Sequence, residues 1–389
     1  MISSQAALEK KLGIDLQAIC QVMESQSDAM EQNNTMTETV FEALSDTGLF
    51  HLMAPKAFGG IEAEPSDIID LGEMFGYHSG SGGWAFSQNT GVMAYSAYLS
   101  PECGQKVAST KAASGVFAPL GTAEKNGGSY EVAGHYQYGS GSLHAEYIGC
   151  GALEMNDGEL CDFDDAGNPP VVCFFVPTAG VEFKGNWDVM GLQGTGSVDY
   201  EVPLQSVEAG MTFSLFTKEA VTGGPLYGIG PIGLASIGAC GWALGVATRA
   251  LDEAFKVVEA GRTRMGMAAL KDQQVFQRES GRQIAALKAA RLLVHDSYNQ
   301  SFSYAKETGQ GITNELHAEL KIAGTHLFNT ARQVTTFAFE TAGSQGFRNP
   351  SRIQQCFRDI FTGGLHIAFD ERYFEDASKL RMGMDTQIV

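Results

Sequence analysis

The sequence has few basic residues, and this shortage limits the partners that the chain can bind. Lys and Arg number 26 against 45 Asp and Glu, which gives a formal net charge of −19 over 389 residues. A surface this acidic repels nucleic-acid phosphates and anionic membrane surfaces. We therefore expect neither a nucleic-acid partner nor a membrane partner.

The cysteines lack any paired arrangement. Seven are scattered along the chain, and no two of them form C-x-x-C. This spacing indicates neither a disulfide framework nor a structural zinc site, so we expect reduced thiols and no metal. The first residues also lack the apolar core of a signal peptide. A cytoplasmic protein is the expectation.

Several catalytic motifs are missing as well. The chain contains no G-x-S-x-G, no H-E-x-x-H and no G-x-x-x-x-G-K-[ST], so the corresponding hydrolase, zinc and phosphate sites have no support. Residues 228–233 match G-x-G-x-x-G, but no apolar strand precedes them and Pro231 removes a needed amide. The longest uncharged stretch, residues 220–248, is rich in glycine and suits a linker leading into a buried helix better than a membrane span.

Three segments of different texture divide the chain, which is too long for one typical core. Residues 1–115 mix helical patterns with turns, and place a cluster of small residues, 79–83, before Trp84. Residues 116–215 contain short apolar or alternating runs, which predict a β domain of sandwich or barrel type. Residues 1–115 therefore predict a helical domain, and residues 216–389 predict a second one. The strand-like runs are 130–138, 147–155, 171–176 and 197–202.

The third segment has helical periodicity and no proline between Pro231 and Pro350. Leu251 and Phe255 share one predicted face, with Arg249 opposite, and Ile284 belongs to the inward face of the next helix. Long antiparallel helices of this kind pack as a bundle.

Two polar turns and a histidine form the candidate site. Residues 139–145, Gly-Ser-Gly-Ser-Leu-His-Ala, place hydroxyls, an imidazole and backbone amides on one turn, and residues 187–197 place Trp187 beside a Gly-rich Thr/Ser loop. His366 follows Arg358 by eight residues. Each feature alone fits an ordinary turn, a core tryptophan or a structural histidine. Together they suit a flavin, which needs donors near N5 and its pyrimidine oxygens on an apolar wall.

The order of these motifs resembles the acyl-CoA dehydrogenase superfamily over nearly the whole chain. Residues 134–147 look like the family's turn at the flavin edge, and residues 187–197 are similar to its Trp-x-x-x-Gly-x-x-Gly-Thr-Gly-Ser segment. Residues 262–266 resemble R-x-x-F-G, with Met in place of Phe. Residues 342–347 resemble the Gly-Gly-x-Gly-Tyr element that approaches the cofactor of a neighbouring subunit. The resemblance implies an α+β fold with an N-terminal helical domain, a β domain and a C-terminal four-helix bundle, assembled as a homotetramer.

The residues disfavour the usual reaction of that superfamily. Dehydrogenation needs a carboxylate base to remove a proton α to the thioester carbonyl. Where such enzymes carry Tyr-Glu-Gly-Thr after an Arg-Asp pair, this chain has Gly-Gly-Leu-His at 363–366, and no acid lies between Glu219 and Asp252.

The pattern resembles instead the two-component (group D) flavin-dependent monooxygenases built on this fold. In that group a separate NAD(P)H:flavin reductase supplies reduced FAD or FMN, O2 forms a flavin C4a-hydroperoxide, and one oxygen passes to a small aromatic or cyclic substrate. The resemblance therefore implies a reductase, O2 and a small molecule as partners.

Roles for single residues follow from the same resemblance. Ser140 would donate to flavin N5, while Ser142 and the turn amides, Gly141 included, would hold the pyrimidine side. His366 would stabilise the peroxide or orient the substrate. His144 would act as base for a phenolic substrate or make a structural hydrogen bond.

The remaining candidates would contact other parts of the cofactor. Those expected to line the ring and its ribityl chain are Trp187, Thr195 and Ser197. Those expected to contact phosphate or adenylate are Arg262, Arg264 and Gln273, although a solvated helix face explains the arginines equally well. Those expected near a neighbour's cofactor are Gly343 and Gly346.

Two other readings of the sequence stay open. A FAD-containing acyl-CoA dehydrogenase would need a base elsewhere in the sequence and would bind oxidised FAD tightly. A flavin-free scaffold protein of the same fold would bind flavin in neither redox state. The linear sequence does not select the substrate.

Overall fold

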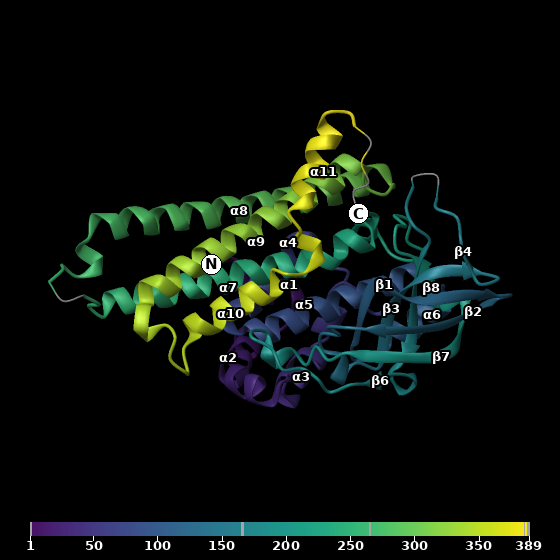
Figure 1. The fold of residues 1–389 in the computed structure, drawn as a ribbon, viewed down its shortest axis with the longest axis horizontal. Coiled ribbons are helices and arrows are strands. Elements are labelled where there is room, and N and C mark those ends of the chain that lie inside the picture. Colours follow the sequence, from purple (N-terminus) through teal and green to yellow (C-terminus); the bar gives the residue numbers. More distant parts are fainter. Residues whose placement is uncertain (1, 165–166, 264–265, 385, 387–389) are drawn as a thin grey trace.

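Helices precede and follow a central sheet in the computed structural model, which describes residues 2–164, 167–263, 266–384 and 386. Figure 1 shows the sheet at one end of the molecule and the long C-terminal helices extending away from it. This order confirms the predicted α+β fold class.

The N-terminal helices are joined by short connections. They are α1 (Ile2–Leu12), α2 (Leu16–Asn33), α3 (Glu38–Ser45), α4 (Pro65–His78), α5 (Gly80–Ala94) and α6 (Pro101–Ala108). A single residue separates α4 from α5: the Ser79 amide bonds to Phe75 O at the end of α4, and its hydroxyl accepts from Gly82 N at 3.1 Å at the start of α5. Such a serine cap satisfies an amide that the first helical turn leaves unpaired.

The middle segment forms one hydrogen-bonded sheet with the order β6-β7-β2-β1-β3-β5-β8, and β4 pairs with β3. Strands β1 and β3 run parallel, and the other pairs are antiparallel. The strands are β1 (Ala113–Asn126), β2 (Ser129–Tyr136), β3 (Tyr147–Asn156), β4 (Glu159–Leu160), β5 (Val171–Pro177), β6 (Glu182–Phe183), β7 (Tyr200–Glu208) and β8 (Thr212–Ser214).

The sequence patterns missed β1, the longest of these strands. Its register with β3 shifts on both sides of Pro119, next to Gly121. A proline and glycines at bulges interrupt the alternation by which a strand is recognised. From the sequence alone, Pro119 and Gly121 therefore predict a turn and not a strand.

The C-terminal helices form the bundle around α7. They are α7 (Pro231–Glu259), α8 (Gln274–Thr308), α9 (Asn314–Ala342), α10 (Arg352–Gly363) and α11 (Arg372–Arg381). Helices α4, α5, α9 and α10 all pack against α7. By length and composition α7 could cross a membrane, but 83% of its most apolar window is buried inside the protein, as in the core helix of a globular protein.

Glycines bring α4 and α7 very close together. A Cβ added at Gly241 would lie 2.1 Å from the carbonyl oxygen of Ile69, and one added at Gly245 would lie 2.1 Å from that of Glu73. The two helices therefore touch backbone to backbone, which fixes α4, and through Ser79 the start of α5.

The predicted helix faces are wrong at two positions. Arg249 is only 8% exposed, because α7 is covered on several sides, and its guanidinium pairs with Glu24 of α2 and with Glu253. Ile284 is 48% exposed, because the first half of α8 lies at the edge of the bundle (Figure 1).

Candidate functional site

The turn at residues 139–145 follows β2 and uses its own amides to hold its shape. Gly141 has a left-handed φ of +74°, and residues 142–144 form a 3₁₀ turn. The amides of Ser140, Gly141, Ser142 and His144 donate to the carbonyls of Tyr138, Thr195, Gly139 and Gly141 over 2.8–3.2 Å. These amides are not free donors, contrary to the prediction that they hold a ligand.

A chain of buried hydroxyls links this turn to the loop of residues 187–197. The indole Nε1 of Trp84 donates to Ser140 Oγ at 3.1 Å, and Ser140 Oγ lies 2.8 Å from Ser197 Oγ. Ser197 Oγ lies 2.6 Å from Thr195 Oγ1, which donates to Leu192 O at 2.8 Å. The structure thus brings three predicted site residues together and adds Trp84 from α5.

The direction of each hydrogen bond follows from the two ends of the chain. A carbonyl only accepts, so Thr195 uses its single proton on Leu192 O. Ser197 must then donate to Thr195, and Ser140 to Ser197. In this arrangement Ser140 keeps no proton for a ligand.

The direction of the hydrogen bonds in the hydroxyl chain can reverse without leaving a buried carbonyl unpaired. Leu192 O also accepts from the indole Nε1 of Trp187 at 3.1 Å. If Thr195 turns its hydroxyl towards Ser197, that carbonyl stays bonded, Ser197 donates to Ser140, and the proton of Ser140 points outwards. A ligand atom that accepts a hydrogen bond at Ser140 would favour this second arrangement, so the residues fit the predicted cofactor.

Two further buried polar atoms beside Ser140 have no partner in the described residues. They are Ser142 Oγ, which is fully buried, and Asn89 Oδ1, whose Nδ2 donates to Ser140 O at 3.0 Å. An unpaired buried polar atom costs about 1–3 kcal/mol. Both atoms are available to a polar group bound next to the hydroxyl chain, which fits the predicted cofactor.

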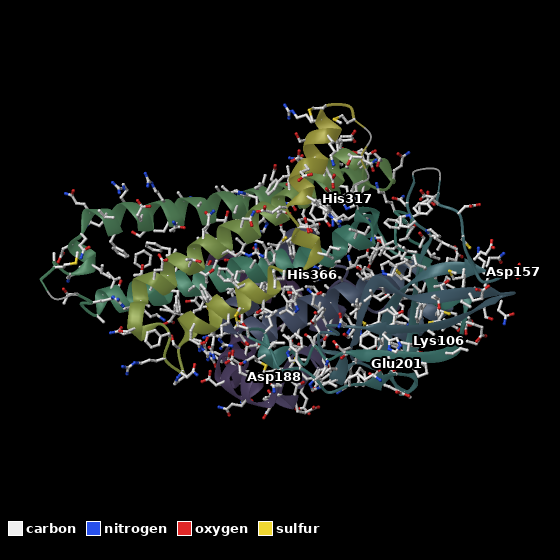
Figure 2. The ribbon with its side chains drawn as sticks, in the orientation of Figure 1. Lys106, Asp157, Asp188, Glu201, His317 and His366 are labelled. Carbon is white, nitrogen blue, oxygen red and sulfur yellow. The ribbon has the colours of Figure 1, made fainter. Side chains whose placement is uncertain are left out.

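His366 lies just beyond α10, near the middle of the molecule in Figure 2. Its Nδ1 accepts from the amide of Ala368 at 3.2 Å, and burial, with the nearby Lys321, lowers the pKa of the imidazole to about 4. The ring is therefore neutral at pH 7 with its proton on Nε2. Within the described residues no hydrogen bond occupies Nε2, so this N–H is a free donor.

Trp84 joins His366 to the hydroxyl chain. Its ring lies edge-on to the imidazole with centroids 6.0 Å apart, and edge-on to Trp242 at 4.8 Å. These rings form an apolar cluster beside the imidazole. Trp187 is partly buried, its N–H donates to Leu192 O, and its ring lies edge-on to Tyr138 with centroids 6.5 Å apart.

His144 takes the structural alternative. Its Nε2 lies 2.9 Å from Met36 O, and its ring stacks on Phe41 with centroids 5.0 Å apart. These contacts tie the 139–145 turn to the connection between α2 and α3, and they leave its role as a base without support.

Four of the remaining candidates lie next to the ends of α7, α8 and α9, at the end of the bundle remote from the sheet (Figure 1). Arg262 follows the end of α7, so it does not stand on a helix as predicted, and a Cβ at Gly343 would collide with its guanidinium. Gln273 directly precedes α8 and donates from Nε2 to Ala268 O at 2.7 Å, and Gly346 ends the 3₁₀ turn after α9. Arg264 lies outside the described residues. One chain does not bring this group to Ser140.

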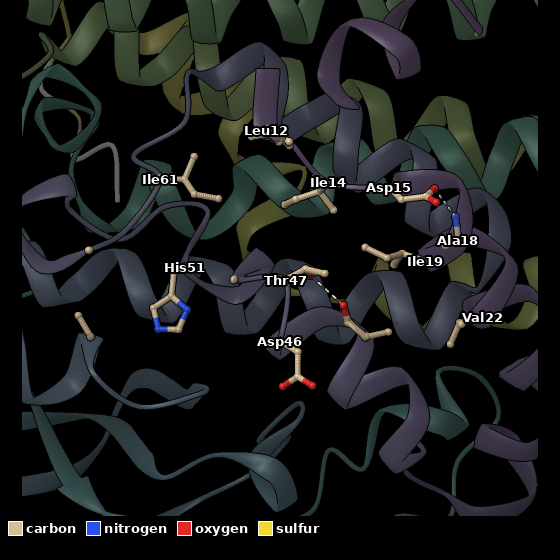
Figure 3. A pocket seen from close by; sticks show the side chains of 15 residues that line it. Leu12, Ile14, Asp15, Ala18, Ile19, Val22, Asp46, Thr47, His51 and Ile61 are labelled. Carbon is tan, nitrogen blue, oxygen red and sulfur yellow. Dashed lines mark hydrogen bonds between the residues drawn. The ribbon is translucent and has the colours of Figure 1, made fainter. Parts of the chain in front are cut away.

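An open cavity of about 830 Å³ lies elsewhere, between the α1–α2 connection and the α3 turn (Figure 3). Leu12, Ile14 and Ile61 line it, and His51 bonds through Nε2 to Thr110 O at 2.8 Å. None of the candidate site residues borders it. Among the described residues no group of three His, Cys, Asp or Glu side chains could hold a metal ion.

Comparison with known proteins gives related sequences along most of the chain. Residues 237–371 match the family model for the acyl-CoA dehydrogenase C-terminal domain. The indole-3-acetate monooxygenase of Pseudomonas putida is 26% identical over 91% of this chain and 89% of its own length. The oxygenase subunit HsaA of a flavin-dependent monooxygenase from Mycobacterium tuberculosis is also 26% identical, over 88% of each chain.

Solved structures agree on the fold. The 3-HSA hydroxylase of Rhodococcus sp. RHA1 superposes with a TM-score of 0.87 at 22% identity, covering 96% of this chain and 97% of its own. XiaF from Streptomyces sp., solved with FADH2 and glycerol, gives 0.86 at 17% identity, covering 98% and 97%. The resemblance indicated by the sequence motifs is confirmed, and the relatives favour a monooxygenase over an acyl-CoA dehydrogenase.

Proposed function

We propose that this chain, a flavin-dependent oxidoreductase of the acyl-CoA dehydrogenase fold, is the oxygenase component of a two-component monooxygenase. It would hydroxylate a small aromatic or cyclic substrate. A separate NAD(P)H:flavin reductase would supply reduced FAD or FMN. The observation that carries the proposal is the neutral His366, which presents an N–H donor beside Trp84 and the Ser140 hydroxyl chain. A dehydrogenase of this fold would need a carboxylate base.

The residues on both sides of the hydroxyl chain would hold the flavin. Ser140 would donate to it after the chain reverses, and the ring face of Trp187 and the unpaired Ser142 Oγ would contact it. When bound, reduced flavin supplies the two electrons with which O2 is split between the substrate and water.

His366 and the surrounding rings would act on the oxygen and the substrate. The imidazole would donate from Nε2 to an oxygen atom at the reaction centre, and its low pKa would keep this donor in one protonation state at neutral pH. The rings of Trp84 and Trp242 would exclude water, which limits loss of the oxygen as hydrogen peroxide.

A homotetramer belongs to the same proposal. Arg262, Gln273, Gly343 and Gly346 would then contact the phosphate or adenylate of a flavin held by another subunit. A cytoplasmic location is also proposed, and the seven free cysteines support it.

The test mixes anaerobic protein loaded with reduced FAD or FMN with oxygenated buffer. We expect a transient near-ultraviolet absorbance before the oxidised flavin spectrum, little hydrogen peroxide when a substrate is present, and faster peroxide release from His366→Ala. In a second arm, protein with oxidised FAD receives an acyl-CoA. Bleaching of the flavin in that arm, with no transient in the first, would return the dehydrogenase to first place. If the protein binds flavin in neither redox state, the flavin-free scaffold protein is the remaining alternative.

A further inference from the structure

Two consecutive residues of α10 hold the loop that ends the hydroxyl chain. Arg358 donates from Nη1 to Met190 O at 2.7 Å, and the amide of Leu192 donates to Asp359 Oδ1 at 2.6 Å. Between these bonds, a Cβ at Gly191 would lie 2.2 Å from the carbonyl oxygen of Arg358. The loop therefore lies directly on the backbone of α10.

Leu192 is a point where such support is needed. Its φ of +57° is a left-handed conformation that a leucine adopts only under constraint from its surroundings. Its carbonyl accepts from both Thr195 and Trp187. Holding the Leu192 amide thus also fixes the acceptor on which the hydroxyl chain depends.

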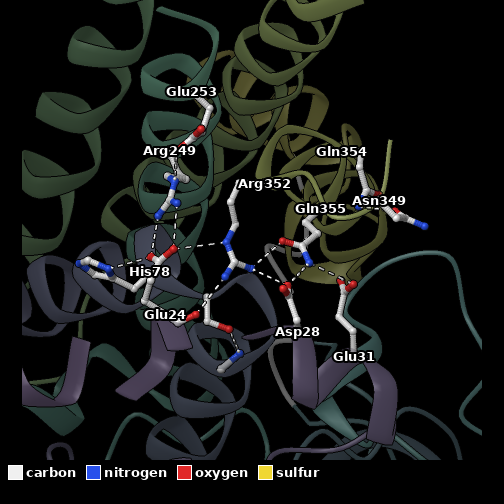
Figure 4. Close-up of polar contacts among 12 residues, drawn as sticks. Glu24, Asp28, Glu31, His78, Arg249, Glu253, Asn349, Arg352, Gln354 and Gln355 are labelled. Atoms are coloured by element: carbon white, nitrogen blue, oxygen red, sulfur yellow. Dashed lines mark hydrogen bonds and ion pairs between the residues drawn. The ribbon is translucent and has the colours of Figure 1, made fainter. Parts of the chain in front are cut away.

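Arg358 is held in turn by the N-terminal helices. Its Nη2 bonds to both carboxylate oxygens of Glu31 of α2, at 2.9 and 3.0 Å, and its Nε donates to Gln354 at 2.6 Å. Figure 4 shows Glu31 within a wider set of polar contacts in which Arg352 and Gln355 of α10 reach Glu24 and Asp28 of α2. This network keeps α10 in register with α2.

Asp359 also contacts the start of α5. The carboxyl is 3% exposed, and a Cβ at Gly80 would lie 2.0 Å from its Oδ2. One residue further along α5, Ser81 Oγ accepts from Gly194 N at 3.0 Å, so α5 holds the loop at a second point. Asp359 therefore sits where the loop, α10 and the helix carrying Trp84 meet.

We propose that Arg358 and Asp359 are positioning residues that clamp residues 190–192 and thereby set the Leu192 carbonyl and the Ser140 hydroxyl for flavin. The inference rests on the proposed function for its flavin half. Neither side chain contacts the reacting atoms. Asp359 holds the loop by accepting a hydrogen bond from the Leu192 amide, and Arg358 holds it by donating one to the Met190 carbonyl.

The test compares amide hydrogen exchange of residues 187–197 in flavin-free protein. For Asp359→Leu we expect exchange in this loop to rise about tenfold, with β2 and β3 unchanged, and affinity for reduced FAD to fall about tenfold. Asp359→Asn keeps an oxygen acceptor for the Leu192 amide and should restore both. Cys356→Ala removes a buried side chain of α10 that bonds neither the loop nor Glu31, so it should lower the melting temperature without loosening residues 187–197.

Unchanged loop exchange in Asp359→Leu would overturn the clamp, as would equal loosening in Cys356→Ala. If Asp359→Leu fails to fold, Arg358→Gln opens the Met190 side alone and is judged by the same exchange. If the wild type binds no reduced flavin, the proposed function fails, and the exchange data still decide the clamp because they are measured without flavin.

Discussion

The number of protons at single residues decides what the candidate site can offer. Trp84 brings one proton into the hydroxyl chain, and Leu192 O accepts at the other end. Between them each hydroxyl donates once, so only the direction of the chain determines whether Ser140 gives or accepts. The sequence suggested the right serine, but the direction depends on contacts across 56 and more residues, which a linear pattern does not contain.

Removing Thr195 should fix that direction. In Thr195→Val, Ser197 can donate only to Ser140, so the Ser140 proton points outwards permanently. We expect reduced-flavin affinity to be kept or to rise within about threefold, whereas Ser140→Ala should lose about tenfold. Anaerobic titration measures both. An equal loss in the two variants would contradict the hydroxyl chain as described.

Asp359 should make stability depend on pH. Burial raises the pKa of its carboxyl to about 7, against about 3.9 in the unfolded chain. The folded state therefore keeps a proton that the unfolded state has lost, and stability falls as the pH rises from about 4 to about 7. Asp359→Asn removes this loss, so its melting temperature should gain on the wild type across that window. Calorimetry at several pH values tests this, with the exposed Asp188→Asn as the control for one lost charge.

Whole helices were predicted more reliably than their faces. Apolar periodicity locates α7, α8 and α9, but it assumes that each helix has one solvent-exposed face. At Arg249, α7 has no such face. The site shows the same limit. Residues 139–145 and 187–197 could be found because each lies within one segment, while Trp84 and Asp359 join them from α5 and α10. Small residues before Trp84 and the acid after Arg358 were the only local signals.

The close approach of α4 and α7 can be tested with two alanines. Gly241→Ala places a methyl group against the Ile69 carbonyl and should cost about 1–3 kcal/mol in the free energy of unfolding. Gly281→Ala on the exposed face of α8 meets nothing within 4 Å and should gain roughly 0.5–1 kcal/mol. Denaturant unfolding measures the difference. A stable Gly241→Ala would mean that the helices can separate freely.

The molecule as a whole holds its candidate site in two distant parts. Ser140 follows β2 and His366 follows α10, whereas Arg262 follows the far end of α7. Motif order in the sequence assigns both parts to one cofactor, and the proposed homotetramer would join them. The net charge of −19 would oppose that assembly at low salt.

Arg262→Ala should therefore weaken flavin binding only in the assembled protein. We expect a loss of about tenfold in the oligomer, because one charge-assisted contact disappears. Arg282→Ala, an exposed arginine of α8 in a surface pair with Glu279, is the matched control. Sedimentation run beside the titration gives the oligomeric state. The same loss in a dissociated chain, or none in the oligomer, would refute a shared site.

Ser79 makes the connection between α4 and α5 a stiff one. One residue ends α4 and begins α5, so no spacer absorbs movement between the helix seated on α7 and the helix that carries Trp84. Helix α5 packs against both α7 and β1, and Trp84 on it donates to Ser140 Oγ at 3.1 Å. A change in the angle between bundle and sheet would therefore strain this hydrogen bond and, through it, the first hydroxyl of the chain.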